Sequence, residues 1–227
     1  MAPIKIVRMV KLVKEEVSEG KGGRIRQQNT LVILEAAEQE FAANGYKGTS
    51  MQAIADRAGL PKANLHYYYK SKGNLYGAVL ERIIKSWNDG LAHMSEDDDP
   101  AEVLESYIRL KVDLACHYPH RSKLFASEII SGAPALHQYI RKDMRKFLRE
   151  KVRIIQSWID QGKIKAVDPY HLMFMIWATT QHYADFETQI LMLMNRAEYD
   201  EDDVEQICRH LIEVILTGCG LKPSWHS

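Results

Sequence analysis

The fold of this chain is decided by the stretch IADRAGLPKANL at residues 54–65. Ala55 is followed four positions later by Gly59, and Leu65 comes six positions after that glycine. Alanine lets two helices approach closely, glycine reaches the positive φ of a tight turn, and leucine anchors the second helix in the core. This spacing is the skeleton of a helix-turn-helix, whose second helix enters the major groove of DNA. An ordinary helical hairpin can carry the same three residues, so the surrounding sequence has to decide.

The surrounding residues predict helices throughout the chain. Apolar residues recur three and four positions apart almost everywhere and β-branched alternation is absent, which predicts an all-α protein. The first helix carries an apolar stripe that includes Leu31, Leu34 and Phe41. Helices are expected near residues 26–44, 50–58, 61–69, 71–88, 101–116, 120–130, 134–161, 168–194 and 201–219.

Composition and charge narrow the classes of protein. Of the 227 residues, 46% are hydrophobic and 26% are charged, and no run is long enough for a membrane span or a signal peptide, so we expect a soluble, cytoplasmic protein. Residues 1–95 carry 14 Lys and Arg against 9 Asp and Glu, whereas residues 96–227 carry 16 against 21. A basic first half can meet a polyanion such as DNA, although an asymmetry of five charges also arises by ordinary scatter.

Polar residues of the motif are placed to contact DNA. With Leu65 facing the core, Lys62, Asn64 and Tyr67 are left to point outward toward base edges. Tyr68 and Lys72 follow, with polar tips that can reach phosphates. The preceding helix and the run YYYKSK at residues 67–72 favour a DNA-binding unit over a simple hairpin.

Residues 26–90 resemble the DNA-binding domain of the tetracycline-repressor (TetR) family. The resemblance rests on FAANGYKGTS at residues 41–50 and on the motif at residues 54–65. The chain departs from the family pattern at Pro61, where serine or threonine is usual, at His66, usually tyrosine, and at Tyr69, usually phenylalanine. The resemblance implies a homodimer, a pseudo-palindromic double-stranded operator and a helical C-terminal domain that binds a small effector. It also assigns phosphate roles to Thr49, Tyr68 and Lys72, and base contacts to Lys62, Asn64 and Tyr67.

These observations predict three parts of the chain. Residues 1–23 are expected to be a flexible N-terminal arm, residues 24–72 the helix-turn-helix domain, and residues 73–227 the ligand-binding and dimerisation domain. The acidic loop at residues 97–100 is the clearest boundary in the composition of the chain.

The second half resembles the pyrimidine-utilisation regulators of the same family. The resemblance rests on short stretches between residues 107 and 134 and on HLMFMIWATTQHYADF at residues 171–186. It implies that Trp87, Trp177 and Gln181 lie near a site for a pyrimidine such as uracil or thymine, with Phe125 and Glu128 as further candidates.

The chemistry of Trp177 and Gln181 fits such a ligand. The two residues are four positions apart and share one helix face. Tryptophan offers a flat wall for stacking, and the amide of glutamine offers donors and an acceptor in one plane. The alternatives are a core tryptophan, an interface or solvated amide and, for Trp87, plain packing between domains.

Two other functions stay open. The repressor could respond to a purine, an amino-acid derivative or a lipophilic compound. A metal-dependent enzyme could use His182 and Asp185, which are three apart, but no H-E-x-x-H, G-x-S-x-G, G-x-G-x-x-G or P-loop pattern is present. We therefore predict no catalytic residue, no metal and no cofactor.

The last two expected helices are apolar on more than one side, which predicts a four-helix interface in a homodimer. The residues behind this prediction are Ile190, Leu191, Leu193, Val204, Ile207, Leu211, Ile215 and Leu216.

Overall fold

The computed structural model describes residues 21–226, with side chains from Ile25 onward, and the described part is helical without strands. Of the arm expected at residues 1–23, residues 1–20 lie outside the described part of the chain. The first described helix begins at Lys21, three residues before the expected start of the DNA-binding domain.

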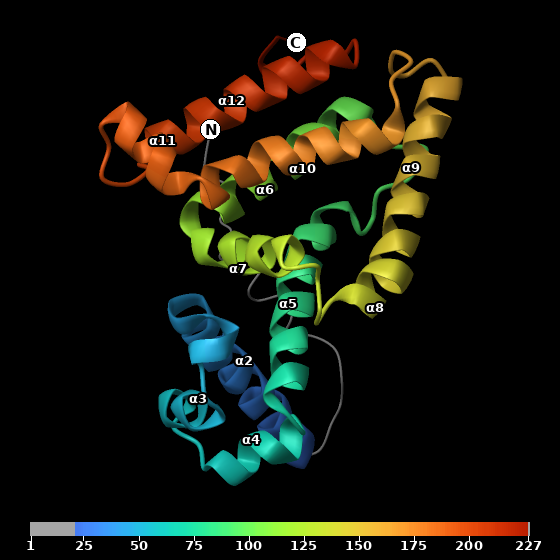
Figure 1. Ribbon diagram of the computed structural model, residues 1–227. Helices are drawn as coiled ribbons and strands as arrows, with labels where there is room; N and C mark the ends of the chain where they lie inside the picture. Colours follow the sequence, from blue (N-terminus) through green and yellow to red (C-terminus); the bar gives the residue numbers. More distant parts are fainter. Residues whose placement is uncertain (1–20, 227) are drawn as a thin grey trace.

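Four helices form the lower part of the molecule (Figure 1). They pack with apolar residues inward, as the three- and four-residue spacing predicts. Their bounds are α2 (Lys21–Gly48), α3 (Met51–Ala58), α4 (Lys62–Tyr68) and α5 (Lys72–Asn88).

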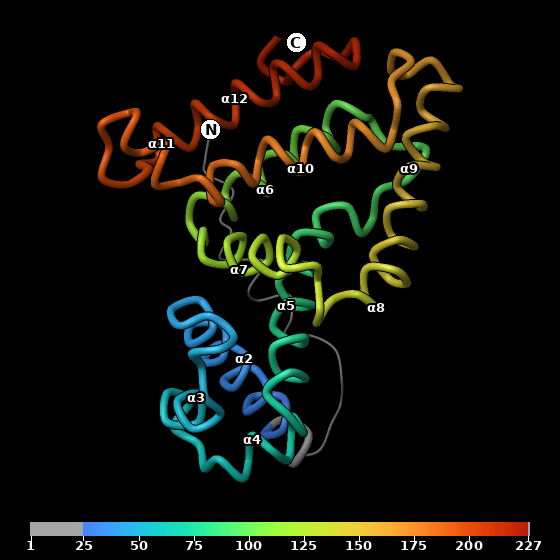
Figure 2. The backbone as a smooth tube through the Cα atoms, viewed as in Figure 1, coloured from blue at the N-terminus to red at the C-terminus, as the bar shows by residue number. Residues whose placement is uncertain are grey.

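The remaining helices form the upper part, where α6 packs against both α10 and α12 and α9 stands at one side (Figure 1). The loop at residues 92–99 runs toward α9 (Figure 2), where Glu96 accepts a hydrogen bond of 3.0 Å from Ser157. The bounds are η2 (Asp89–Leu91), α6 (Pro100–His117), α7 (Pro119–Ile130), α8 (His137–Tyr139), the π-helical η3 (Ile140–Met144), α9 (Arg145–Asp160), α10 (Pro169–Asp185), α11 (Glu187–Met194), α12 (Glu201–Gly218) and η4 (Ser224–His226).

Two hydrophobic cores hold these layers. The upper core joins α6, α9, α10 and α12 around Tyr107, Trp158 and Ile212. The lower core joins α2 to α5, and it also takes in Leu124 from α7 and Leu136 from the segment that follows. Because α7 is packed into the lower core, the DNA-binding helices are in direct contact with the second domain.

Three local expectations were wrong. Leu31 is 45% exposed, and Ile33 takes the buried place instead. The helix expected over residues 168–194 breaks at Phe186, which leaves the helical region and separates α10 from α11. The helix expected over residues 134–161 begins at His137 and includes a π-helical turn.

Candidate functional site

The turn between α3 and α4 has the predicted geometry. Gly59 adopts φ 64° and ψ 30°, and its N–H donates to the carbonyls that end α3. Ala55 and Leu65 are fully buried on either side of the turn. A left-handed residue at this position strains any side chain, which explains the glycine.

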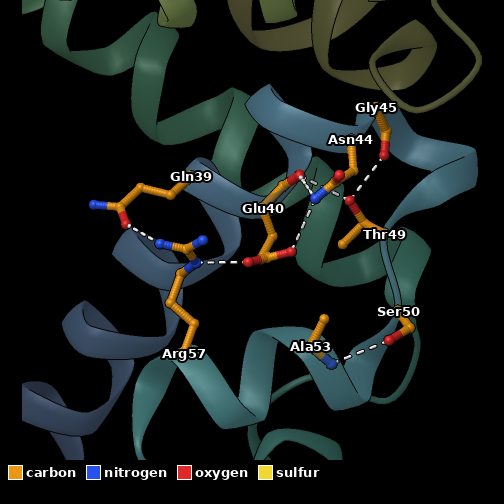
Figure 3. Close-up of polar contacts among 8 residues, drawn as sticks. All are labelled: Gln39, Glu40, Asn44, Gly45, Thr49, Ser50, Ala53 and Arg57. Atoms are coloured by element: carbon orange, nitrogen blue, oxygen red, sulfur yellow. Dashed lines mark hydrogen bonds and ion pairs between the residues drawn. The ribbon is translucent and has the colours of Figure 1, made fainter.

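The start of α3 is fixed from inside the domain (Figure 3). Ser50 caps the helix by accepting a hydrogen bond of 3.0 Å from the N–H of Ala53. The buried hydroxyl of Thr49 lies 2.9 Å from the carbonyl of Glu40 and 2.8 Å from that of Gly45. A hydroxyl has one hydrogen to donate, and here it is shared between two carbonyls. In this conformation the hydroxyl of Thr49 orders the turn, and its predicted contact with a phosphate stays a prediction.

The guanidinium of Arg57 is also bound by neighbouring side chains of the protein. Its Nε lies 2.6 Å from the carboxylate of Glu40, and its Nη1 donates to Gln39 at 2.9 Å (Figure 3). Asn44 donates to the other oxygen of Glu40 at 3.1 Å. These contacts hold α3 against α2, so the basic charge of Arg57 supports the motif from behind.

The recognition helix α4 leaves the predicted base-contacting residues on its outer side. Lys62 is exposed, Asn64 is half-buried, and Tyr67 is 74% exposed, with no neighbouring domain over it. Pro61 occupies the position before the helix and makes no side-chain capping bond. An exposed aromatic ring beside a lysine at the start of a recognition helix suits contact with base edges and sugars.

Tyr68 and Lys72 lie at the junction of the motif with its neighbours. The hydroxyl of Tyr68 accepts a hydrogen bond of 3.3 Å from Asn29. The ammonium of Lys72 donates to the carbonyls of Tyr46 at 2.8 Å and Thr49 at 2.9 Å. An ammonium has three N–H groups, so one remains for a phosphate after the other two have tied α5 to the turn before α3.

A second cluster of the predicted residues lies where α5 ends between α6, α7 and α10. Trp87 is buried, and its ring meets Phe125 of α7 edge-on with 5.1 Å between centroids. The ammonium of Lys111, from α6, lies 4.1 Å from the centroid of the Trp87 ring. An aromatic face attracts a cation at this distance. The structure thus brings Trp87 and Phe125 together and adds a lysine.

Gln181 is connected to α7 through a relay of hydrogen bonds. Its amide nitrogen lies 3.5 Å from the hydroxyl of Ser122, a buried residue of α7. That hydroxyl in turn donates to the carboxylate of Asp185 at 2.6 Å. The relay joins α7 to α10. Its carboxylate, that of Asp185, also attracts the ammonium of Lys111.

Trp177 lies one turn before Gln181 and is held from α6. Its indole N–H donates to the hydroxyl of Tyr107 at 2.8 Å. Tyr107 is four residues before Lys111 on α6, so both project from one face of that helix. Burial raises the pKa of Tyr107, which keeps the phenol neutral. Trp177 is partly buried and packs against the upper core, so part of its ring stays accessible.

Lys111 is the residue of this cluster that sequence reasoning missed. It is 3% exposed, and burial lowers the pKa of its ammonium to about 7 despite the opposing effect of Asp185. The stretch YIRLK at residues 107–111 contributed to the family resemblance, but a lysine within an amphipathic helix usually faces water. Only the packing of α6 under α5 and α10 reveals its burial.

Glu128, another predicted ligand residue, has partners within the protein, and its role toward a ligand stays a prediction. It is buried, and its carboxylate accepts hydrogen bonds from the N–H groups of Ala135 at 2.5 Å and Leu136 at 3.2 Å. Burial and the nearby Glu128 together raise the pKa of Tyr76 to about 12. Glu128 therefore closes the turn after α7 against α5.

A buried ion pair connects α7 to the DNA-binding domain. Glu38 of α2 is 5% exposed, and its carboxylate lies 2.6 Å from Nε of Arg121 and 3.0 Å from Nε2 of His120. Burial raises the pKa of Glu38, but the hydrogen bonds from His120 and Arg121 outweigh it, and the pKa is lowered overall. Arg121 directly precedes Ser122 of the relay, so one helix reaches both sites.

The alternative metal site is not assembled. His182 is exposed and stacks on Phe186 with 4.8 Å between ring centroids, while Asp185 is engaged with Ser122. Across the described residues no group of three or more His, Cys, Asp and Glu side chains could hold a metal ion. In the same part of the chain, no helix has the length and apolarity to cross a membrane.

Two surface hollows lie outside the Trp87 cluster. One, of about 560 Å³, lies between α9 and the start of α10, and Arg149, Arg153 and Tyr170 are among its lining residues. The other, of about 380 Å³, lies between α5 and α8 and is lined in part by Arg82 and Tyr139.

The residues behind the predicted dimer interface divide into two groups. Most are buried within the chain's own upper core, whereas Leu193 is 80% exposed. Other apolar side chains are exposed on α10, α11 and α12, and at the break between α10 and α11, instead. They are Phe174, Met175, Phe186, Met192, Met194 and Val214.

Comparison with known proteins gives two family matches. The family described as "Bacterial regulatory proteins, tetR family" matches residues 33–79, and "YcdC-like protein, C-terminal region" matches residues 80–222. The HTH-type transcriptional regulator RutR from Escherichia coli (strain K12) is 39% identical over 199 residues, which is 88% of this chain and 94% of that protein.

Solved structures agree on the fold. FadR from Bacillus subtilis, in complex with stearoyl-CoA, has a TM-score of 0.61 at 21% identity and covers 83% of this chain and 98% of its own. AibR, in complex with isovaleryl coenzyme A and operator DNA, has a TM-score of 0.61 at 20% identity and covers 82% of this chain and 97% of its own.

Proposed function

The chain belongs to the TetR family of bacterial regulatory proteins, and from this premise we propose that it is a dimeric repressor, acting in the cytoplasm, whose effector is a pyrimidine such as uracil or thymine. It is a DNA-binding transcriptional regulator that responds to a small effector, and its family is not one of enzymes. The proposal concerns the effector, the dimer and the direction of the response.

The DNA contacts are proposed from the outer face of α4. Lys62, Asn64 and Tyr67 would meet base edges in the major groove, because Lys62 and Tyr67 are exposed and Asn64, half-buried, lies between them on the same helix. Tyr68 and the remaining N–H of Lys72 would meet phosphates and set the register of the helix on the duplex. A pseudo-palindromic operator follows if two such helices are related by a two-fold axis.

The observation that carries the effector proposal is the contact of Trp87 with Phe125 and with the buried Lys111. Gln181 lies against Ser122 on α7, the helix that also carries Phe125. Aromatic rings suit a flat heterocycle, and the amide and ammonium suit the alternating carbonyl and N–H groups of a pyrimidine. A long acyl chain would leave these polar groups without partners at a cost of about 1–3 kcal/mol each. The resemblance of residues 171–186 to the pyrimidine-utilisation regulators supports the same choice.

The response would pass through α7. This helix carries Phe125 and Ser122 in the effector cluster and Arg121 at the ion pair with Glu38 of the DNA-binding domain. An effector that binds one position of α7 better than another would thereby change the position of α2 and the spacing of the two recognition helices. A ligand shifts such an equilibrium only through a difference in affinity for the two states.

The dimer is proposed from the exposed apolar side chains of α10, α11 and α12. Phe174 and Val214 lie on the two longest helices of this set, where two copies can form a four-helix contact. Exposed apolar surface of this kind commonly marks an interface.

The effector is tested by thermal denaturation of the purified chain with uracil, thymine, cytosine and xanthine. A ligand that binds only the folded state raises the melting temperature by mass action. We expect uracil or thymine to raise it, and Gln181→Ala to weaken that response. If no base shifts the melting temperature, the pyrimidine proposal is wrong and the other effector classes are tested next. The DNA-binding role is unaffected by that result.

A further inference from the structure

The outer side of η3 and α9 carries a row of basic side chains that no function described so far uses. Six members of this basic row are exposed: Arg141, Lys142, Arg145, Lys146, Arg149 and Arg153. Arg153 pairs with Glu96, whereas the other five make no hydrogen bond or ion pair with any residue that the structure describes. Residues 96–227 are acidic as a whole, with 16 Lys and Arg against 21 Asp and Glu, so the row differs from its surroundings.

The basic row follows the repeat of the helix. The four arginines, Arg141, Arg145, Arg149 and Arg153, are spaced four apart, and so are Lys142 and Lys146. Residues four apart on a helix share one face. The opposite side of α9 is buried in the upper core through Ile154, Ile155 and Trp158. A basic amphipathic helix with a free apolar side suits a membrane surface, but here the protein itself covers that side, and only charge is left for a partner.

Leaving the basic row without a partner costs stability. Like charges four positions apart on a helix repel each other, and a solvated face usually avoids this by mixing signs. Two acidic residues, Asp143 and Glu150, lie within residues 141–153, but neither forms an ion pair with the exposed row. Glu150 is bound instead to the buried Lys151 at 2.9 Å. A row of like charges that the chain does not neutralise points to a polyanion as its partner.

The basic row begins beside the DNA-binding domain. Tyr139 and Ile140, directly before Arg141, pack against the lower core, and Tyr139 lines a hollow together with Glu81 of α5. Glu81 comes nine residues after Lys72, so it lies about 14 Å along α5 from the lysine proposed to meet phosphates. From this point α9 leads away from α4 along the side of the molecule (Figures 1 and 2).

We propose that the basic row binds the phosphate backbone of duplex DNA that flanks the operator, with the duplex bent toward the second domain. The proposal rests on the DNA-binding role of the chain and is independent of the effector. From Arg141 to Arg153 the row extends about 18 Å, which is the length of about five base pairs. Duplex DNA carries one negative charge per about 1.7 Å of its axis, so this length offers more charges than the row has members.

Flanking DNA suits the basic row better than an acidic protein segment does. When α4 lies on the operator, the same duplex continues past the DNA-binding domain, so its phosphates are present at a high effective concentration. Phosphate contacts carry no base specificity and need only a row of cations, without pockets for particular side chains. Bending a duplex costs free energy, and the additional phosphate contacts offset that cost.

The experiment compares two duplexes that contain the same operator, selected from randomised DNA with the purified full chain. The short duplex ends at the operator, and the long one adds about 20 base pairs on each side, roughly two helical turns. Fluorescence anisotropy measures the affinity for each duplex from about 50 to 200 mM salt. We expect wild type to bind the long duplex at least about 10-fold more tightly at the lowest salt, with a slope of log affinity against log salt that is steeper by about 2–4.

The test variant combines Arg145→Gln with Arg149→Gln. It should lose most of the preference for the long duplex and bind the short duplex as wild type does. The matched control combines Lys165→Gln with Lys222→Gln, which removes the same charge from exposed lysines outside the row. The control should keep the wild-type preference and the wild-type salt slope.

Each other outcome overturns the proposal. If the test variant keeps the full preference for the long duplex, the basic row does not contact DNA and is left for an acidic protein partner. If the control loses as much preference as the test variant, net charge and not the row explains the effect. Should the test variant fail to fold, hydroxyl-radical footprinting of wild type on the long duplex decides. Protection that extends beyond the operator supports the proposal, and protection that stops at the ends of the operator contradicts it.

Discussion

The ion pair between α2 and α7 gives a prediction whose size can be worked from the structure. In Arg121→Met the Nε donor 2.6 Å from Glu38 is lost, while most of the side-chain volume stays. Glu38 keeps His120 at 3.0 Å, so its buried carboxylate is not left wholly unpaired. Losing one hydrogen bond to a buried charge costs about 1.5–3 kcal/mol. For a chain of this size that is a fall in melting temperature of roughly 3–12 °C.

The loss should depend on pH in a defined direction. The folded state lowers the pKa of Glu38, so the stability it contributes is present above the unfolded value of about 4.3 and is lost as the pH falls through the folded value. Arg121→Met should therefore be as destabilising at pH 5 as at pH 7, and its difference from wild type should shrink only below the unfolded pKa of about 4.3. Thermal denaturation followed by circular dichroism at pH 7 and pH 3 measures both values.

The same variant tests the role of α7 in the response. We expect Arg121→Met to bind operator DNA but to show a smaller change in affinity when effector is added. The control is Lys123→Met on the same helix, which breaks an exposed pair with Glu187 of α11 at 2.6 Å. Exposed pairs contribute about 0–1 kcal/mol, so this control should stay near wild type in stability and response. If both variants lose equal stability and both keep the full response, the ion pair does not couple the domains.

Three further substitutions extend the account. Gly59→Ala should cost about 1–2 kcal/mol in denaturant unfolding from its positive φ alone, because nothing lies within 4 Å of the added Cβ, and an unchanged midpoint would contradict the turn geometry. Tyr67→Ala should leave the melting temperature unchanged, since the ring is 74% exposed, yet weaken operator binding in fluorescence anisotropy; undiminished affinity would exclude this face from the DNA. Val214→Asp, at a 55% exposed position of α12, should shift light scattering from dimer to monomer, and a dimer that persists would place the interface elsewhere.

Local patterns sufficed for the helix-turn-helix. The motif needs a small buried residue, a residue with positive φ and a buried anchor, all close in sequence. Ala55, Gly59 and Leu65 meet these needs as predicted. Start and stop signals also placed most helices to within a few residues. Ser50 caps α3 and Asp168 caps α10, because a side-chain oxygen before a helix accepts from its first N–H groups.

Tertiary packing decided what the sequence did not reveal. The break at Phe186 has no glycine or proline to announce it. The hydrogen bonds from Thr49 to Glu40 and from Ala135 to Glu128 join residues nine and seven positions apart within the protein, a separation that no helical spacing announces. Lys111 is a further case, because its burial depends on α5 and α10 crossing α6, which no local pattern contains.

The central claim is that a pyrimidine controls DNA binding by this chain. The most direct measurement selects an operator from randomised duplexes with the purified protein and then follows anisotropy of that operator at fixed salt with increasing uracil. The account predicts that saturating uracil weakens operator affinity, and that Gln181→Ala binds the operator normally but needs more uracil for release. Unchanged operator affinity at saturating uracil would contradict it.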